Sequence, residues 1–596
     1  MRASAPRPFP LQFLGLRWPR PVAIAVCGLL GVLLPAAFGA LFGVRAPVVH
    51  DEFSYLLGAD TLSHGRLANP APALPEFFEA PHVLVAPTYA SKYPPGQPLV
   101  LALGQALTGR PIWGVWLGCG LFGASLCWML QAWAGRRWAL ALSIVVLLTL
   151  GTSSYWAQSY WGGMLPATGA ALVLGGMRRL LVSPLVVPSV ATAVGAVLLA
   201  STRPYEGLLV CLPAAALILA ALRRDPAPLR LKLRRVVLPF AVVGVLAGTG
   251  TGIYNDAVTG DWRRSPYLLH LDQYFHQGPF LFSAASEPTR EPVERVARFY
   301  DEHRTQPLRG FALAKRSVVN LFVRSGQALG VPFGFAGAPT PQPQGYRGVL
   351  LWLALLVPAV WVRARWPSAL ALVLALAALE CAAWLYLPKY PFSLLPVVVG
   401  AWLVAFLLAW PRNRWGTFIV ITALLVLGGQ AVVWWWSSHY SAPAVPLILA
   451  GAATALQRLR RARGAGENRQ LLGQVLVAVF AVHLATLALT TALASPRPGN
   501  NPGRSLLWRA DLVHRLESNG GRHLVFVRYA PGFTVHEEWV YNGAALADGS
   551  IVFAHDLGAG NAALIEALPG RSVWVAKVSE RGLEVEPYRQ QRFRRP

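Results

Sequence analysis

Thirteen apolar runs, each close to the length of a membrane-spanning helix, recur along this chain of 596 residues. A transmembrane helix needs about 20 consecutive apolar residues. We therefore predict an all-α polytopic membrane protein with about 13 transmembrane helices. The composition agrees, because charged residues make up only 13% of the chain, against about 25% in a soluble domain. The runs cover residues 21–44, 112–134, 138–154, 163–180, 185–202, 204–222, 236–254, 346–362, 367–387, 392–410, 416–436, 443–457 and 470–495.

Basic residues fall on alternate connections between these runs. With the basic segment 1–20 in the cytoplasm, every second connection carries at least two of them, whereas the short connections on the other side carry only Arg203 and Lys389. Short cytoplasmic loops are enriched in Lys and Arg. The alternation therefore supports the helix count and predicts a cytoplasmic N-terminus and a C-terminus on the opposite side of the membrane. The net charge of +26 then reflects topology, and we expect no nucleic-acid partner.

Three segments on the predicted outer face are long, at residues 45–111, 255–345 and 496–596. The first can form two surface helices, over 51–64 and 95–107, by the spacing of their apolar residues. The last predicts a small periplasmic α/β domain beyond the transmembrane domain 21–495. Its expected elements are helices at 504–517 and 561–568 and strands at 523–529, 551–555, 572–578 and 583–585.

Two adjacent carboxylates, Asp51 and Glu52, follow the first apolar run directly. A carboxylate at this depth is partly desolvated and can act as a general base. The alternative is structural, with Asp51 capping the next helix and Glu52 complementing its dipole.

The motif Lys92-Tyr93-Pro94-Pro95-Gly96 ends the same outer segment. A lysine is a point charge suited to phosphate, and the prolines fix the backbone beside it. The alternative is a lysine that snorkels to the membrane interface.

Together these motifs resemble the lipid-phosphate-sugar-dependent glycosyltransferases of GT-C fold, in the branch that is protein-mannosyltransferase-like and aminoarabinose-transferase-like (families 39 and 83). The motif resemblance covers residues 45–110 and the resemblance in topology covers 20–596. It implies a bacterial inner-membrane protein whose C-terminus is periplasmic. It also implies a polyprenyl-phosphate-sugar donor held in membrane lipid, an envelope lipid, glycan or protein as acceptor, and no cofactor. It also implies that Asp51, with Glu52 as its rival, activates the acceptor, and that Lys92 binds the lipid phosphate.

Further residues of the outer face complete the predicted substrate-binding set. Arg203 breaks the positive-inside pattern, so it is a candidate second phosphate ligand, with an ion pair to Glu206 as the alternative. Lys389 and Tyr390 form a similar outer turn, for which interfacial anchoring is the alternative. Tyr55, His82 and Tyr93 belong to the same set. No cysteines are spaced for metal, and His536-Glu537-Glu538 lacks the second histidine of a zinc motif, so the sequence predicts no metal site.

Two other functions are compatible with a chain of this class. A transporter or flippase for a lipid-linked or acidic solute could use Glu380 and Arg203 on a transmembrane path. Transporters commonly show internal repeats, and the long one-sided outer segments argue against this alternative. A scaffold whose C-terminal domain binds envelope partners is the third possibility.

Overall fold

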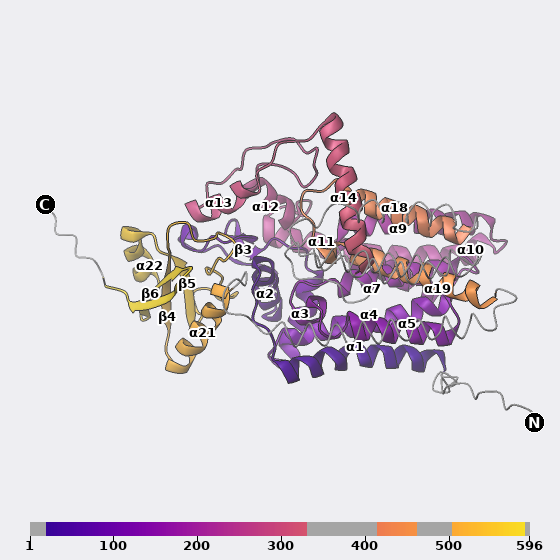
Figure 1. Ribbon diagram of the computed structural model, residues 1–596, viewed down its shortest axis with the longest axis horizontal. Helices are drawn as coiled ribbons and strands as arrows, with labels where there is room; N and C mark the ends of the chain where they lie inside the picture. The colour runs from indigo at the N-terminus through magenta and orange to yellow at the C-terminus, as the bar shows by residue number, and fades with distance from the viewer. Residues whose placement is uncertain (1–18, 331–413, 462–503, 590–596) are drawn as a thin grey trace, which may run out of the picture.

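The structure is a computed structural model that describes residues 19–330, 414–461 and 504–589. Apolar helices run side by side in one part of the molecule, and the C-terminal residues form a separate lobe beyond one end of them (Figure 1). The predicted spans 346–362, 367–387, 392–410 and 470–495 lie outside the described residues, so the count of 13 stays a prediction. Lys389 and Tyr390 lie outside them as well.

Helices occupy the predicted apolar runs wherever the structure describes them. They are α1 (Arg20–Phe42), α4 (Ile112–Trp133), α5 (Arg136–Thr149), α7 (Met164–Leu180), α8 (Val186–Ala200), α9 (Pro204–Arg224), α11 (Leu238–Thr259), α18 (Arg414–Ala431) and α19 (Val445–Arg461). By length and composition, four stretches of the described chain can cross a membrane: Arg20–Phe42, Ile112–Trp133, Pro204–Arg224 and Leu229–Thr259. The last begins before the predicted 236–254, because α10 (Leu229–Lys232) and the π-helix η3 (Leu233–Val237) lead directly into α11.

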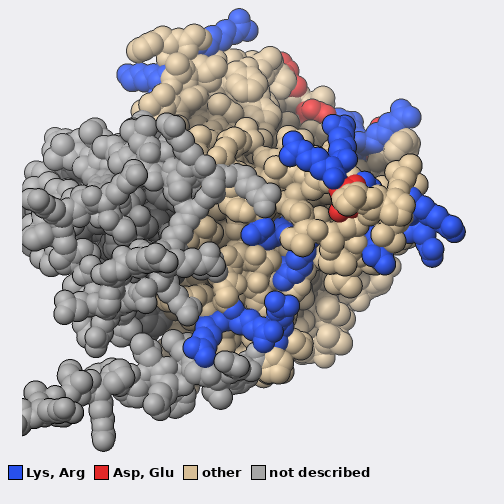
Figure 2. Space-filling view, turned by 90° about the vertical axis from the view of Figure 1, so that its right-hand side faces the viewer, with Lys and Arg blue, Asp and Glu red and all other residues tan. Residues whose placement is uncertain are grey.

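Lysine and arginine side chains gather at the end of the helices that faces away from the C-terminal lobe, where acidic side chains are few (Figure 2). Helices α7 and α9 both end there. The basic residues that terminate these helices or follow them are Arg178, Arg179, Arg223, Arg224, Arg230, Lys232, Arg234 and Arg235. This one-sided distribution agrees with the alternation of charge along the sequence.

The segment predicted as an outer loop, 255–345, contains a long helix that the sequence did not indicate. Helix α14 (Gly310–Gly330) follows the shorter helices α12 (Pro266–Tyr274) and α13 (Glu294–Glu302). It packs along α18, where Asn320 donates to the carbonyl of Ala431 at 2.9 Å and Arg324 donates to that of Gln430. Polar and basic residues interrupt the apolar pattern of α14, so its sequence lacks the signature of an apolar span.

The first outer segment forms the two predicted helices and a small sheet between them. The helices are α2 (His50–Ser63) and α3 (Gly96–Thr108), which pack against each other. Between them lie β1 (Asn69–Pro70), the 3-10 helix η2 (Pro75–Phe77), β2 (Val83–Leu84) and β3 (Thr88–Ser91), with the antiparallel strand order β1-β3-β2.

The C-terminal residues fold into the predicted α/β arrangement, here called the C-terminal module (residues 504–589). Its elements are α21 (Arg504–Asn519), β4 (His523–Tyr529), β5 (Ile551–His555), the 3-10 helix η6 (Gly558–Gly560), α22 (Asn561–Ala567), β6 (Ser572–Ser579) and β7 (Gly582–Pro587). The sheet order is β5-β4-β6-β7, in which β5, β4 and β6 are parallel and β7 is antiparallel to β6.

The C-terminal module shares its hydrophobic core with the first outer segment, which the sequence did not reveal. Phe53 and Leu57 of α2 and Phe77 belong to the same buried cluster as Phe526 and Tyr541 of the module. The rings of Phe53 and Tyr541 stack with their centroids 4.4 Å apart. The module therefore covers one face of the helix that carries Asp51 and Glu52.

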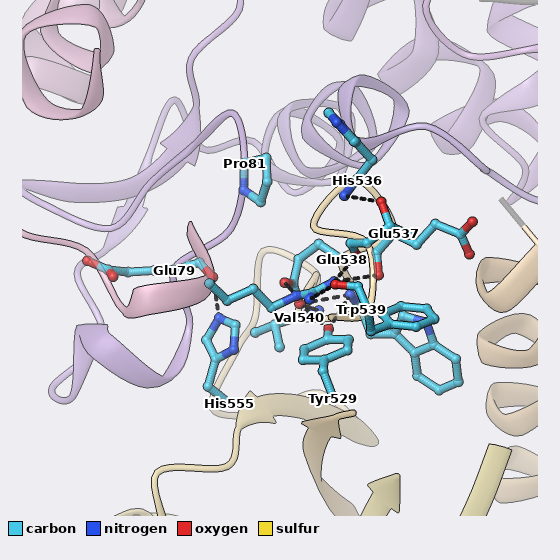
Figure 3. A network of polar contacts seen from close by, with 12 residues as sticks. Glu79, Pro81, Tyr529, His536, Glu537, Glu538, Trp539, Val540 and His555 are labelled. Carbon is cyan, nitrogen blue, oxygen red and sulfur yellow. Dashed lines mark hydrogen bonds and ion pairs between the residues drawn. The ribbon is translucent and has the colours of Figure 1, made fainter. Parts of the chain in front are cut away.

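Buried polar contacts reinforce this docking. Asp60 of α2 accepts a hydrogen bond from the Ala544 amide at 2.7 Å, and the His555 ring lies 2.7 Å from the carbonyl of Glu79 (Figure 3). Arg295 of α13 places its Nε 2.8 Å from Oε2 of Glu538, and both side chains are buried. Both long outer segments are thus tied to the C-terminal module.

Candidate active site

A cavity of about 1870 Å³ lies where the first outer segment meets the ends of α8, α9 and α11. Seven of the predicted site residues line it: Asp51, Tyr55, His82, Lys92, Tyr93, Arg203 and Glu206. These residues come from three separate stretches of the sequence. The fold therefore brings the predicted acidic and basic residues to one cavity.

Asp51 points into this cavity from the first turn of α2. Its Oδ1 accepts a hydrogen bond from the Tyr93 hydroxyl, and its Oδ2 lies 2.9 Å from Nδ1 of His50. Burial alone would raise the pKa of Asp51, but His50, His82 and the Tyr93 hydroxyl outweigh it and hold that pKa well below its usual value. Asp51 is therefore an ionised carboxylate inside the cavity at neutral pH.

Glu52 does not line the cavity, although it is the next residue. Its carboxylate accepts hydrogen bonds from the backbone amides of Val48 (2.9 Å), Val49 (3.2 Å) and Tyr160 (3.1 Å). It is 3% exposed, and this burial raises its pKa to about 7 although the backbone amides act in the opposite direction. Glu52, and not Asp51, therefore caps the N-terminus of α2.

Lys92 also lines the cavity and is buried among aromatic rings. Its Nζ lies 5.2 Å from the ring centroid of Tyr93, 5.4 Å from that of Tyr267 and 5.5 Å from that of Phe275. It forms no ion pair within 4.0 Å with any residue that the structure describes. Burial lowers its pKa to about 7, with Asp51 acting in the opposite direction and Arg203 in the same one.

Arg203 lies in the turn between α8 and α9, on the same cavity. Its guanidinium stacks over Tyr440 at 3.9 Å, and no ion pair joins it to Glu206 within 4.0 Å. Gly96 of the lysine motif holds this turn close, because its amide donates to the carbonyl of Ser201 at 3.0 Å and a Cβ at this position would lie only 2.6 Å from that oxygen. Glycine at position 96 thus allows the lysine motif to lie directly against the turn that carries Arg203.

Aromatic residues that were not predicted as site residues line much of the remaining wall. They include Tyr267 and Tyr440 and the run Trp434, Trp435 and Trp436. Tyr267 falls within the predicted outer segment, and Tyr440 falls in a short predicted outer connection. In the sequence, only the clustering of aromatic residues near the predicted membrane interface pointed to this wall of the cavity. Such clustering is common among membrane proteins.

The cavity continues from these polar groups into an apolar stretch between α8 and α11. Small residues line both sides, with Ala193, Ala196 and Ala200 on α8 and Gly244 and Gly248 on α11. A Cβ atom placed on either glycine would meet no other atom within 4 Å among the described residues. Among the described residues, small side chains thus bound this part of the cavity on both helices.

Comparisons with known proteins give one structural neighbour to report. No protein-family model matches the chain, and no curated protein matches its sequence. The chain is similar in structure to the archaeal oligosaccharyltransferase AglB from Archaeoglobus fulgidus, solved in complex with an inhibitory peptide and a dolichol-phosphate. The likeness covers 94% of this chain and 69% of that one, at 12% sequence identity and a TM-score of 0.41. A likeness this weak establishes neither a shared fold nor a shared activity.

Proposed function

We propose that the protein is a membrane glycosyltransferase that moves a sugar from a polyprenyl-phosphate donor to an envelope lipid, glycan or protein on the periplasmic face. One observation carries the proposal: a single cavity holds an ionised carboxylate, Asp51, two basic side chains, Lys92 and Arg203, and an apolar extension between α8 and α11. An amphiphilic donor with one phosphate and a long apolar tail matches this combination of basic side chains and an apolar extension.

The proposed orientation of the donor follows from its apolar and charged parts. Its tail lies in the apolar stretch between α8 and α11, and its phosphate meets Lys92 and Arg203. Charge-assisted contacts to a phosphate contribute about 1.5–3 kcal/mol each. The sugar then extends toward Asp51 and the aromatic wall of Tyr267 and Tyr440, whose ring faces can pack against it.

The reaction is a single displacement. The acceptor oxygen attacks the anomeric carbon and forms the new glycosidic bond while the bond from that carbon to the phosphate oxygen breaks. The hydroxyl proton passes to Asp51, and the two electrons of the broken bond stay on the phosphate, whose charge Lys92 and Arg203 stabilise. Attack from the opposite face inverts the anomeric centre. Glu52 holds the start of α2 in place and touches no substrate.

The test combines deletion of the gene with complementation by single variants. Mass spectrometry of envelope glycans and glycoproteins from the deletion strain should reveal a missing sugar, which names donor and acceptor class together. Asp51→Asn should restore about 1% of that sugar or less, because a general base contributes about 10²–10⁴-fold. Asp256→Asn is the matched control, since Asp256 is an exposed carboxylate on α11 outside the cavity. Full restoration by Asp51→Asn would reject the carboxylate role.

Donor binding is measured separately with a long-chain polyprenyl phosphate in detergent. Lys92→Met should weaken this binding by about 10–100-fold, the equivalent of one charge-assisted contact, and should leave binding of the uncharged polyprenol unchanged. Lys315→Met, at an exposed lysine of α14, is the control. Equal affinity of wild type and Lys92→Met for the phosphate would reject the phosphate role.

A further inference from the structure

A dense cluster of positive charge lies at the connection between α9 and α11. Residues 223–235 hold five arginines and one lysine, and their only acidic residue is Asp225. The Asp225 carboxylate accepts a hydrogen bond from the Ala227 amide at 2.8 Å. The five arginines, here called the arginine cluster, are exposed and form no ion pair within 4.0 Å with any residue that the structure describes. They are Arg223, Arg224, Arg230, Arg234 and Arg235.

The helix that follows is too long to lie wholly within the hydrocarbon core of a bilayer. The stretch Leu229–Thr259 is helical over 31 residues, or about 46 Å at 1.5 Å per residue, whereas the hydrocarbon core is about 30 Å thick. A typical tilt of about 20° shortens it only to about 44 Å. The apolar run 236–254 alone spans about 28 Å, so the part before it extends about 10 Å beyond the core. The arginines of that part therefore lie at the level of the lipid headgroups.

Apolar and basic side chains lie next to each other on the exposed face of this part of the helix. Leu229, Leu233 and Val237 are 70%, 46% and 48% exposed. Residues four apart lie on the same side of a helix, so these three form an apolar stripe. Arg230 and Arg234 follow Leu229 and Leu233 directly and are four residues apart themselves, so they form a basic stripe beside the apolar one. A phospholipid likewise places an apolar chain next to a charged headgroup.

Local contacts fix the surface that carries the arginine cluster. The Nζ of Lys232 donates to the carbonyls of Leu222 at 2.7 Å and Asp225 at 2.6 Å, so it caps the end of α9 and ties it to the next helix. Val236 is buried in the core of the helices. The π-helix η3 follows Lys232 directly, and such widened turns are rare and often occur at functional sites. The arginines therefore project from a fixed helical surface.

This arrangement exceeds what membrane insertion requires. The positive-inside rule depends on how many basic residues a connection holds, whatever their arrangement in the folded protein. Basic side chains crowd this end of the helices (Figure 2), and those of the arginine cluster stand at headgroup level beside an outward apolar stripe. Guanidinium groups bind phosphate through two parallel N–H groups. Repulsion among like charges is unfavourable, and an anion bound among the arginines relieves it.

We propose that the arginine cluster is a binding site for an anionic phospholipid of the surrounding membrane. Its guanidinium groups contact the lipid phosphate, and an acyl chain lies along the stripe of Leu229, Leu233 and Val237. Each basic residue near an anionic membrane surface contributes about fivefold in affinity. The bound lipid holds α11 at a fixed depth, and α11 also borders the apolar stretch of the cavity. Lipid binding here does not depend on the proposed transferase activity, so each proposal can fail alone.

The experiment uses the full chain in a neutral detergent, freed of lipid and mixed with phosphatidylglycerol or with phosphatidylcholine of the same acyl chains. Native mass spectrometry gives the affinity for the first lipid bound. Wild type should bind phosphatidylglycerol at least about 30-fold more tightly than phosphatidylcholine, whose headgroup carries a compensating cation. Arg230→Gln and Arg234→Gln together should weaken phosphatidylglycerol binding about 25-fold and leave phosphatidylcholine binding unchanged. Arg223→Gln and Arg224→Gln together, at the end of α9, should give a similar loss.

Arg515→Gln and Arg581→Gln together are the matched control, because both arginines are exposed on the C-terminal module and the same charge is removed. This control should bind phosphatidylglycerol as wild type does, and thermal unfolding without lipid checks that every variant is folded. The proposal is overturned by equal wild-type affinity for the two lipids, or by folded variants of the arginine cluster that lose no more affinity than the control. It is also overturned by an oligonucleotide that displaces phosphatidylglycerol from wild type and requires the same arginines, which would identify nucleic acid as the partner.

Discussion

Replacement of Arg295 by methionine should release the C-terminal module from the second outer segment. Arg295 is 7% exposed and Glu538 is 1% exposed. The guanidinium also donates to the carbonyls of Thr534 at 2.6 Å and Phe533 at 3.3 Å. Methionine can fill much of the same volume, but it leaves the Glu538 carboxylate without its cation and these carbonyls without a donor.

The size of the effect follows from this burial. Removal of one partner from a buried ion pair costs about 3–5 kcal/mol, because the remaining charge stays desolvated. Glu538 keeps hydrogen bonds from the Trp539 and Val540 amides at 2.8 and 2.9 Å and from the Tyr529 hydroxyl. These remaining donors place the expected loss near the lower value, about 3 kcal/mol.

Hydrogen exchange measured by mass spectrometry in detergent tests the prediction directly. A loss of about 3 kcal/mol lowers the protection of amides in β4 by about 100-fold, since 1.4 kcal/mol corresponds to a factor of ten. Arg298→Met is the matched control, because Arg298 lies on the same helix and pairs with Glu294, their side chains being 49% and 88% exposed. Such exposed pairs contribute about 0–1 kcal/mol. Equal protection in the two variants would show that the buried pair does not hold the module.

Two more results are expected from the carboxylates of this region. Glu52→Gln should lower stability by about 1–3 kcal/mol, because an amide group cannot accept from all three backbone donors. Thermal unfolding should show this loss, while sugar transfer per folded molecule should match wild type, and a selective loss of transfer would contradict the structural role. Burial acts to raise the pKa of Glu538, but His555, Arg295 and the Tyr529 hydroxyl outweigh it and lower that pKa. The stability that Glu538 contributes is therefore complete above the unfolded pKa of about 4.3 and is lost as the pH falls through the folded value. The difference in thermal midpoint between wild type and Glu538→Gln should stay the same from about pH 7 to about pH 5 and narrow as the pH falls below about 4. A difference that does not narrow below about pH 4 would exclude this linkage.

Local sequence patterns predict the individual helices and strands better than they predict how these elements pack together. The strands at 523–529 and 551–555 are predicted at their observed bounds, because each is a short run rich in branched and aromatic residues. The sequence also predicts that Arg203 belongs to the same site as Lys92, because Arg203 breaks the charge pattern of the outer connections. Helix α14 gives no comparable signal, because Lys315 and Arg316 interrupt its apolar run early.

Other contacts between distant segments left no sign in the sequence. His82 gave no signal as a partner of His50, because an isolated histidine in a loop has many roles and only the fold sets the distance between the two rings. The choice between Asp51 and Glu52 required the same knowledge. Both are acidic and adjacent, and the three backbone amides that bind Glu52 become visible only in three dimensions.

The shared core of α2 and the C-terminal module has a consequence for biosynthesis. Phe53 and Leu57 leave the ribosome more than four hundred residues before their partners Phe526 and Tyr541. The apolar face of α2 therefore remains without these partners through nearly the whole of translation and membrane insertion. Only when the last stretch has been made and has folded can the helix that carries Asp51 become fully covered, so a nascent chain stalled before residue 504 would display that face to chaperones and proteases.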